Sequence, residues 1–158
     1  RMANEGHEIA THTWDHAAGS GKGVSLNLMS TAERKEEVQK GMDAIKNAAN
    51  KDASVYFRAP GGNFNDSVAN DLRDMVQGEI GWNIDTEDWR RPGADTIASR
   101  IKSAGPGEVI LMHDGGGDRS QTVAALREAL PYLKSQGYKF VTISELIEAY
   151  PYQEGQHS

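Results

Sequence analysis

Residues 108–117 read EVILMHDGGG, an uninterrupted apolar run that ends at His113 and Asp114 and is followed by three glycines. Apolar residues that do not alternate with polar ones indicate a strand buried on both faces, as in a parallel sheet. In such sheets the chemically active groups lie at the carboxyl ends of the strands. This stretch therefore predicts a parallel α/β protein and makes His113 a candidate site residue.

The rest of the chain alternates between strand and helix patterns. Ser30 and Glu33 form a capping-box pattern that opens a predicted helix over 31–50. The alternation predicts an α/β fold with a mostly parallel sheet or barrel. The other predicted helices cover 66–77, 94–104, 120–137 and 144–150, and the predicted strands lie at 7–12, 54–60, within 79–89, at 108–112 and at 139–143.

For two of these helices the sequence also predicts where the helix ends or which face is buried. The helix over 66–77 is expected to end at Gly78, because glycine is the usual residue after a helix. The helix over 120–137 is expected to bury one apolar stripe, which the spacing of its residues defines. That stripe consists of Val123, Leu126, Leu130 and Leu133.

Composition and charge limit the classes of function. The chain has 158 residues, enough for one domain with a core, and a formal net charge of −6. An acidic chain is a poor candidate for a non-specific grip on nucleic acid or anionic lipid. No apolar run is long enough to span a membrane. The absence of cysteine excludes disulfides and cysteine-ligated metal.

The first six residues, RMANEG, have the pattern of the last turn of a helix that ends at Gly6. They contain neither a signal peptide nor a helix cap. We therefore expect the chain to begin inside a domain. Residues 1–150 are expected to form the larger, C-terminal part of that domain, and residues 151–158 are expected to form a tail.

The stretch HTWDH places His12 and His16 four residues apart. On a helix or turn this spacing brings two imidazoles within reach of one metal ion, and neutral imidazole suits Zn²⁺ as well as Co²⁺ or Ni²⁺. The spacing alone is explained equally well if the two histidines are ordinary exposed surface residues. A third ligand is also required, and no spacing singles one out among Asp15, Asp85, Asp88 and Asp114.

The stretch FRAPGG follows a predicted strand with Arg58, Pro60 and two glycines. An arginine at a strand end can pair with a carboxylate in a fixed fork. The backbone N–H of Gly61 is a candidate donor to an oxyanion, because glycine lets the backbone approach a substrate. Taken alone, a surface arginine before a loop explains the stretch as well.

The stretch DTEDW places Asp88 and Trp89 after another predicted strand. An aspartate there is suited to holding a histidine in one orientation, and a tryptophan is suited to lining a sugar pocket. His113, at the end of the buried strand, is the candidate general acid. The alternative readings are a solvated acidic loop and a structural histidine.

Taken in order, HTWDH, RAPGG, DTEDW and LMHD resemble the motifs of the polysaccharide deacetylases, carbohydrate esterase family 4. The resemblance covers nearly the whole chain, including the closing LKSQGYKFVTISEL. It implies a distorted (β/α) barrel and a metal-dependent enzyme that removes acetyl groups from sugars. The expected substrates are polymers of N-acetylglucosamine, namely peptidoglycan, chitin or chitooligosaccharides; an acetylxylan esterase is the alternative within the same class.

The resemblance also implies a role for each candidate residue. His12 and His16 match the metal histidines, with zinc the expected metal, and His113 matches the general acid. Asp88 matches the aspartate that tunes that acid, and Arg58 matches the arginine that pairs with the catalytic base. The substrate-binding positions correspond to Gly61, where the family usually has a tyrosine, to Trp89 in the pocket wall and to Leu111 in the acetyl pocket.

One family motif, T-F-D-D, is absent from the sequence. In the family its aspartates supply the general base and the third metal ligand. The resemblance therefore implies that the first strand or strands of the barrel lie outside this chain, on the same domain or on a second chain. A non-catalytic carbohydrate-binding remnant is the alternative. A cell-wall substrate implies a secreted or wall-associated protein.

Overall fold

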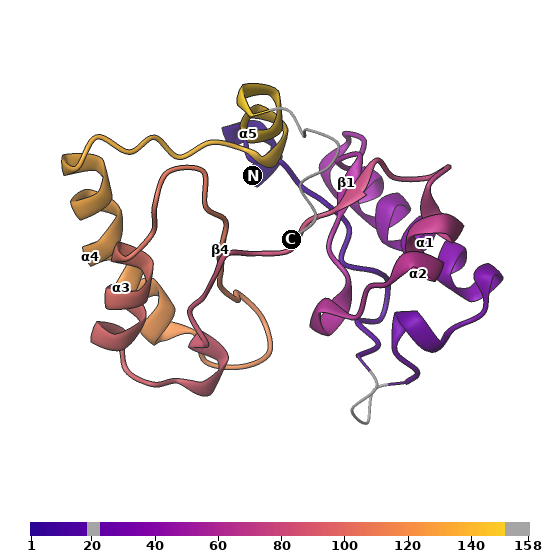
Figure 1. The fold of residues 1–158 in the computed structure, drawn as a ribbon, viewed down its shortest axis with the longest axis horizontal. Coiled ribbons are helices and arrows are strands. Elements are labelled where there is room, and N and C mark those ends of the chain that lie inside the picture. The colour runs from indigo at the N-terminus through magenta and orange to yellow at the C-terminus, as the bar shows by residue number, and fades with distance from the viewer. Residues whose placement is uncertain (19–22, 151–158) are drawn as a thin grey trace. The chain divides into compact units, whose positions relative to one another are not determined.

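The computed structural model describes residues 1–18 and 23–150, and the contacts within it divide the chain into two units, Arg1–Gly81 and Trp82–Ser158 (Figure 1). Each unit contains one pair of parallel strands together with helices. The predicted tail at 151–158 lies outside the described residues. The expectation of one domain over 1–150 stays a prediction.

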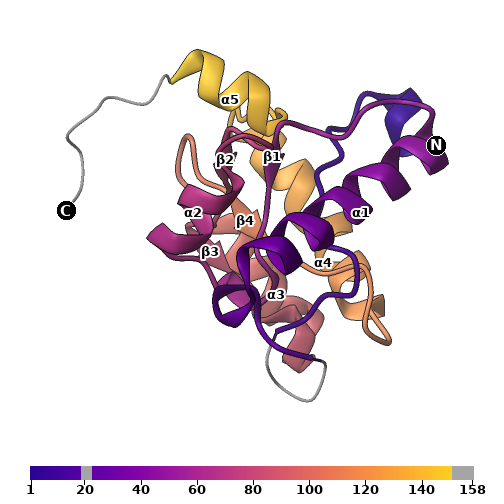
Figure 2. The same cartoon turned by 90° about the vertical axis from the view of Figure 1, so that its right-hand side faces the viewer.

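The elements of the first unit are η1 (Met2–Glu5), η2 (Leu26–Leu28), α1 (Thr31–Ala49), β1 (Tyr56–Phe57), η3 (Pro60–Gly62), α2 (Asp66–Leu72) and β2 (Gly78–Glu79), where η marks a 3₁₀ helix. Those of the second are β3 (Ile84–Asp85), η4 (Asp88–Arg90), α3 (Ala94–Lys102), β4 (Ile110–Leu111), α4 (Ser120–Ser135) and α5 (Ile143–Ala149) (Figures 1 and 2). Within the described residues, no helix combines the length and the apolar character needed to cross a membrane.

The strands pair in parallel, as the sequence predicts, but they are short. In the first unit Tyr56 lies opposite Gly78, and in the second Ile84 lies opposite Ile110. The predicted strand at 7–12 is reduced to a single bridge, in which Thr11 pairs in parallel with Phe57. Because parallel strands point the same way, the residues after each strand leave the pair at the same edge.

The core of the first unit lies between α1, α2 and β1. It contains Leu26, Val38, Phe57, Ala59, Val68, Leu72 and Val76. The helix start predicted at Ser30 is confirmed, because the Ser30 and Glu33 side chains form a complete capping box.

The predicted end of the second helix is wrong. α2 stops at Leu72, and Gly78 lies in β2 instead of capping the helix. The reason is strand pairing: the backbone N–H of Gln77 donates to the carbonyl oxygen of Val55 at 2.7 Å, which draws the chain into the β1–β2 pair.

In the second unit α3 and α4 lie side by side (Figure 1). The stripe predicted for α4 is wrong at its first position, because Val123 is 49% exposed. The buried stripe starts one residue earlier and consists of Thr122, Ala125, Ala129 and Leu133. Small alanines at a helix contact let the two helix axes approach, so packing against α3 selects this face over the bulkier one.

The predicted strand at 139–143 is also wrong. Residues 138–142 are irregular and Ile143 already begins α5, whose first turn is closed by a capping box from Thr142 and Glu145. A strand exists only where another strand accepts its hydrogen bonds. Among the described residues, none pairs with this segment as a strand, and Phe140 and Val141 are about half exposed.

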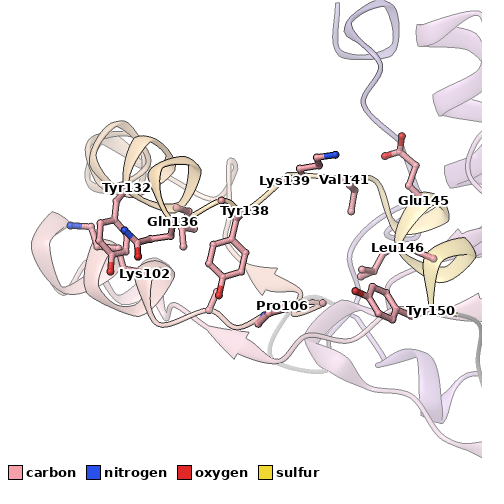
Figure 3. Close-up of a pocket in the computed structure, with 15 residues that line it drawn as sticks. Lys102, Pro106, Tyr132, Gln136, Tyr138, Lys139, Val141, Glu145, Leu146 and Tyr150 are labelled. Carbon is pink, nitrogen blue, oxygen red and sulfur yellow. The ribbon is translucent and has the colours of Figure 1, made fainter.

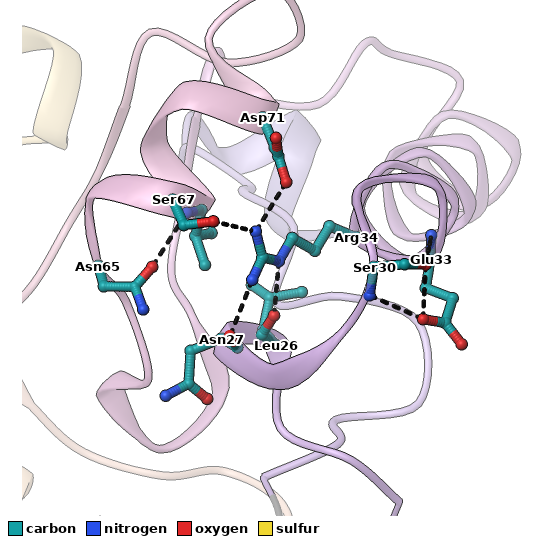
Figure 4. A network of polar contacts seen from close by, with 9 residues as sticks. Leu26, Asn27, Ser30, Glu33, Arg34, Asn65, Ser67 and Asp71 are labelled. Carbon is teal, nitrogen blue, oxygen red and sulfur yellow. Dashed lines mark hydrogen bonds and ion pairs between the residues drawn. The ribbon is translucent and has the colours of Figure 1, made fainter.

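A buried arginine connects three elements of the first unit (Figure 4). Arg34 of α1 is 5% exposed, and its Nη1 donates to Asp71 Oδ2 and Ser67 Oγ of α2, each at 2.7 Å. Its Nε and Nη2 donate to the carbonyl oxygens of Leu26 and Asn27, at 2.9 and 2.8 Å. The guanidinium charge is thus compensated and hydrogen-bonded on every side, which makes its burial tolerable.

Replacing Arg34 with methionine is expected to destabilise the protein by about 3 kcal/mol, because Asp71 and two carbonyl groups lose their partner inside the protein. Urea unfolding of the full chain measures the change. Lys35→Met is the matched control, since Lys35 lies next to Arg34 in α1 and forms an exposed ion pair with Asp74, which follows α2. Equal effects of the two variants would contradict the importance of the buried network.

Candidate active site

The histidine pair lies in a turn that follows the Thr11 bridge. His12 Nδ1 lies 2.6 Å from the carbonyl oxygen of Arg58. A carbonyl oxygen only accepts hydrogen bonds, so Nδ1 carries the proton and the neutral ring has its lone pair on Nε2. Metal-binding histidines in proteins are commonly oriented in this way, by a hydrogen bond from their second nitrogen.

The ring of His16 lies beside that of His12, with 4.8 Å between the ring centroids and 70° between the ring planes. The predicted approach of the two imidazoles is therefore present, and imidazole is a residue type that zinc takes as a ligand. The role of the two histidines as metal ligands stays a prediction. Within residues 1–18 and 23–150, no group of three or more histidine, cysteine or carboxylate side chains could hold a metal ion. Asp15, the candidate third ligand from the same turn, does not complete such a group.

The backbone of this turn is strained. Thr13 has φ 66° and His16 has φ 57°, which is the left-handed region that side chains other than glycine rarely adopt. The Thr13 Oγ1 atom is buried without a hydrogen-bond partner. Strain of this kind costs on the order of 1–3 kcal/mol per residue and persists only where the surroundings hold it.

Helix α1 packs closely against the same turn at Gly41. A Cβ atom at this position would lie 2.1 Å from Thr11 Oγ1 and 3.1 Å from the carbonyl oxygen of Thr13. Thr11 Oγ1 in turn accepts the Thr13 N–H at 3.2 Å. Only glycine allows this approach, so the helix backbone itself supports the turn.

Arg58, the next candidate, leaves β1 towards the chain after β2. Its Nε donates to the carbonyl oxygen of Ile80 at 2.8 Å, and its Nη2 to that of Gly81 at 3.1 Å. Burial lowers the pKa of the Arg58 guanidinium, and the nearby Glu79 carboxylate opposes that shift. These contacts fix the direction of the side chain, and the predicted pairing of Arg58 with a catalytic base stays a prediction.

Gly61 lies in η3 with φ 65° and ψ 9°. A side chain would be strained in this conformation, and its Cβ atom would lie 3.1 Å from Asn63 Nδ2. The glycine at this position is therefore matched to the local backbone. Its predicted role as an oxyanion donor stays a prediction.

Asp88 and His113, predicted to act together, form a hydrogen-bonded pair in the second unit. Asp88 is 1% exposed, and its Oδ1 lies 2.7 Å from His113 Nδ1. Its Oδ2 accepts the backbone N–H of His113 and the hydroxyl of Thr122, each at 2.8 Å. The His113 side chain is 37% exposed, so the ring is held at one nitrogen and reaches solvent.

The contact of Thr122 with Asp88 was not predicted from the sequence. Thr122 lies in the first turn of α4, and nothing in its neighbourhood marks it, because its partner Asp88 is far away in the sequence. Burial by itself would raise the pKa of Asp88, but the hydrogen bonds from His113 and Thr122 outweigh burial and hold that pKa below its usual range. Asp88 therefore stays ionised as an acceptor for His113.

The two predicted pocket residues differ in exposure. Trp89 follows Asp88 in η4 and is 51% exposed, with the Arg90 guanidinium 4.7 Å from the centre of its ring. Leu111 lies in β4 and is 9% exposed. The indole is thus available to a ligand, whereas Leu111 is almost enclosed.

A separate pocket of about 600 Å³ lies in the second unit, away from these residues (Figure 3). Residues of α3, α4 and α5 and of the segments that follow these helices line it, among them Lys102, Tyr132, Tyr138, Glu145 and Tyr150. None of the candidate site residues selected from the sequence lines it.

Both units are of the α/β type: each contains a pair of parallel strands, and in each a histidine held through Nδ1 follows a strand or bridge. A family model described as polysaccharide deacetylase matches residues 1–76. A chitooligosaccharide deacetylase of Bradyrhizobium sp. (strain ANU 289) is 33% identical, and the match covers 92% of this chain and 69% of that protein. The chain belongs to the polysaccharide deacetylase family.

Two further similarities bear on function. A peptidoglycan-N-acetylglucosamine deacetylase of Bacillus cereus is 37% identical, over 93% of this chain and 66% of its own length. The solved structure of a CE4 family pseudoenzyme from Bacillus anthracis matches with a TM-score of 0.78 and 31% identity, over 92% of this chain and 48% of that chain. The chain thus spans at most about two thirds of these two proteins.

Replacing Gly41 with alanine is expected to lower the melting temperature, although the same change within a free helix surface stabilises by up to ~1 kcal/mol. The reason is the collision of the new Cβ atom with Thr11 Oγ1. The Thr11→Ala, Gly41→Ala double variant is expected to recover part of the loss, since the colliding atom is gone. A higher melting temperature for Gly41→Ala alone would show that the turn is not packed as described.

The Asp88–His113 pair predicts a pH dependence. Because the folded pKa of Asp88 is depressed, its contribution to stability is complete above the unfolded value of about 4 and is lost as pH falls through the folded value. The difference in unfolding free energy between wild type and Asp88→Asn should therefore narrow below about pH 4. Urea unfolding from pH 3 to 7 tests this, with Asp114→Asn as the control for removing one carboxylate. A constant difference would contradict it.

Proposed function

We propose that this chain is part of a metal-dependent deacetylase that removes acetyl groups from N-acetylglucosamine polymers, namely peptidoglycan, chitin or chitooligosaccharides. The observation that carries the proposal is the Asp88–His113 pair, in which a buried carboxylate orients a partly exposed imidazole. The names of the Bacillus cereus and Bradyrhizobium relatives support the class of substrate.

His12 and His16 would hold the metal, for which zinc is the first choice and cobalt or nickel the alternatives. When bound, a divalent metal polarises an acetyl carbonyl and lowers the pKa of bound water. The hydrogen bond from His12 Nδ1 to Arg58 supports this role, because it presents the Nε2 lone pair as the ligand.

The remaining residues act on the substrate and its leaving group. His113 donates a proton to the departing amine, and Asp88 keeps the ring oriented for that transfer. The backbone N–H of Gly61 donates to the developing oxyanion. Trp89 and Leu111 form walls of the pocket for the sugar and its acetyl group, and Arg58 pairs with the catalytic base.

The base and the third metal ligand have to come from elsewhere, because the sequence contains no T-F-D-D motif. We propose that an aspartate-bearing segment outside this sequence completes a distorted (β/α) barrel, within the same polypeptide or as a second chain. Action on cell-wall polymers places the protein outside the cell or in the wall.

One second function has a specific observation in its favour. The described residues bring the candidate metal ligands His12 and His16 together without a third ligand beside them, and the similar structure from Bacillus anthracis belongs to a pseudoenzyme. A chain without a completed metal site would bind carbohydrate without hydrolysing it. The two functions make opposite predictions for acetate release.

The test is acetate release from N-acetylglucosamine oligomers and from acetylxylan, with zinc, by the chain fused to a segment carrying T-F-D-D. The fused wild type is expected to release acetate from the oligomers. His113→Ala should lower the rate at least about 100-fold, the usual effect of losing a general acid, while zinc binding is retained. His7→Ala is the control, because it removes an exposed histidine outside the site.

Undiminished acetate release by His113→Ala would disprove the role of the acid. Sugar binding without turnover by the zinc-loaded wild type would favour the non-catalytic function. Release from acetylxylan alone would identify an esterase.

A further inference from the structure

Glu37 of α1 makes a contact that the functions above do not use. Its Oε2 accepts the backbone N–H of Trp14 at 3.1 Å and that of Asp15 at 3.2 Å. Both amides lie between the two metal-binding histidines of the HTWDH turn. One carboxylate oxygen therefore holds the centre of this turn from a separate element of the fold.

The position of Glu37 on the helix explains the contact. Glu37 precedes Gly41 by four residues, so both occupy the same face of α1. Gly41 brings the helix backbone against Thr11 and Thr13, at the start of the turn. The carboxylate one helical turn away then reaches the next two amides. The same helix face supports successive residues of the turn.

The neighbouring glutamates of α1 have other functions. Glu33 closes the capping box with Ser30, and Glu36 forms an exposed ion pair with Lys40. The contact with the turn is thus specific to the face of α1 on which Glu37 lies, and is not a general property of this acidic helix.

Because the backbone of the turn is strained, the contact with Glu37 affects where the two histidine rings lie. The turn contains positive φ angles at Thr13 and at His16 itself, on both sides of the amides that Glu37 holds. Consecutive amides that converge on one carboxylate oxygen restrict the peptide planes between them. Without this acceptor, the two N–H groups would turn to water and the strained backbone would relax, which moves the His16 ring relative to that of His12.

We propose that Glu37 is a positioning residue for the metal-binding pair, acting through the turn backbone and not as a ligand. The inference rests on the proposed function, because it takes His12 and His16 as metal ligands. It adds a requirement to that function: the spacing H-x-x-x-H presents both imidazoles to one metal only when a carboxylate from α1 holds the turn.

The experiment measures Zn²⁺ affinity of the full chain by competition with a chromophoric chelator, together with amide hydrogen exchange at Trp14 and Asp15. Glu37→Ala is expected to weaken Zn²⁺ binding on the order of 10-fold, as is typical for residues that orient metal ligands, and to speed exchange of both amides. Glu37→Gln should retain most of the affinity, because its amide oxygen still accepts both N–H groups.

Glu36→Ala is the matched control, since it removes the same charge from the neighbouring position without touching the turn; it should bind Zn²⁺ like wild type. A thermal melt of each variant verifies that the chain is folded. Wild-type affinity and unchanged exchange in Glu37→Ala would overturn the inference. Equal losses in Glu37→Gln and Glu37→Ala would also overturn it, because the effect would then come from charge and not from the hydrogen bonds.

His12→Ala separates the inference from the proposed function. If His12→Ala weakens Zn²⁺ binding and Glu37→Ala does not, the metal site stands and the positioning role fails. If His12→Ala leaves Zn²⁺ binding unchanged, the proposed metal site fails, and the role of Glu37 fails with it.

Discussion

Parallel pairing of very short strands is the constraint on which both groups of candidate residues depend. Thr11 and Phe57 pair in parallel, and the residues that follow them, His12 and Arg58, are joined by a hydrogen bond. In the second unit β3 and β4 pair in the same sense, and Asp88 and His113 follow them. Since parallel strands end at the same edge, segments distant in sequence deliver their side chains to one place.

Helix packing supplies the rigidity that such short strands lack. α1 holds the histidine turn through a glycine contact and holds η2 and α2 through the buried guanidinium of Arg34. In the second unit, Thr122 at the start of α4 contributes a hydrogen bond to Asp88, while the alanine face of the same helix packs on α3. In both units a helix that carries none of the proposed catalytic groups determines where those groups lie.

The described residues contain some of the groups that the proposed hydrolysis requires but not all of them. The imidazole of His113 and those of the candidate metal ligands His12 and His16 are present, each with a hydrogen bond or ring contact that fixes it. A third ligand is not found beside the histidines within the described part of the chain. The proteins that this chain resembles include both a deacetylase and a pseudoenzyme, so the completeness of the metal site, and not family membership, separates the two proposed functions.

Local patterns were sufficient to predict much of this protein. The capping box at Ser30, the left-handed Gly6 after η1 and most of the order of strands and helices were predictable, because each depends on residue type and on neighbours in the chain. The pairing of Asp88 with His113 was predicted from the resemblance to a known family, whose motifs contain both residues. The tertiary structure decided what depends on distant partners. Pairing of Gln77 with Val55 ended α2 early, packing on α3 exposed Val123, and the irregular segment at 138–142 has no strand beside it in the described residues. The contacts of Glu37 and Thr122 with the site belong to the same class, since a hydrogen bond between residues far apart in sequence leaves no trace in the spacing of either one.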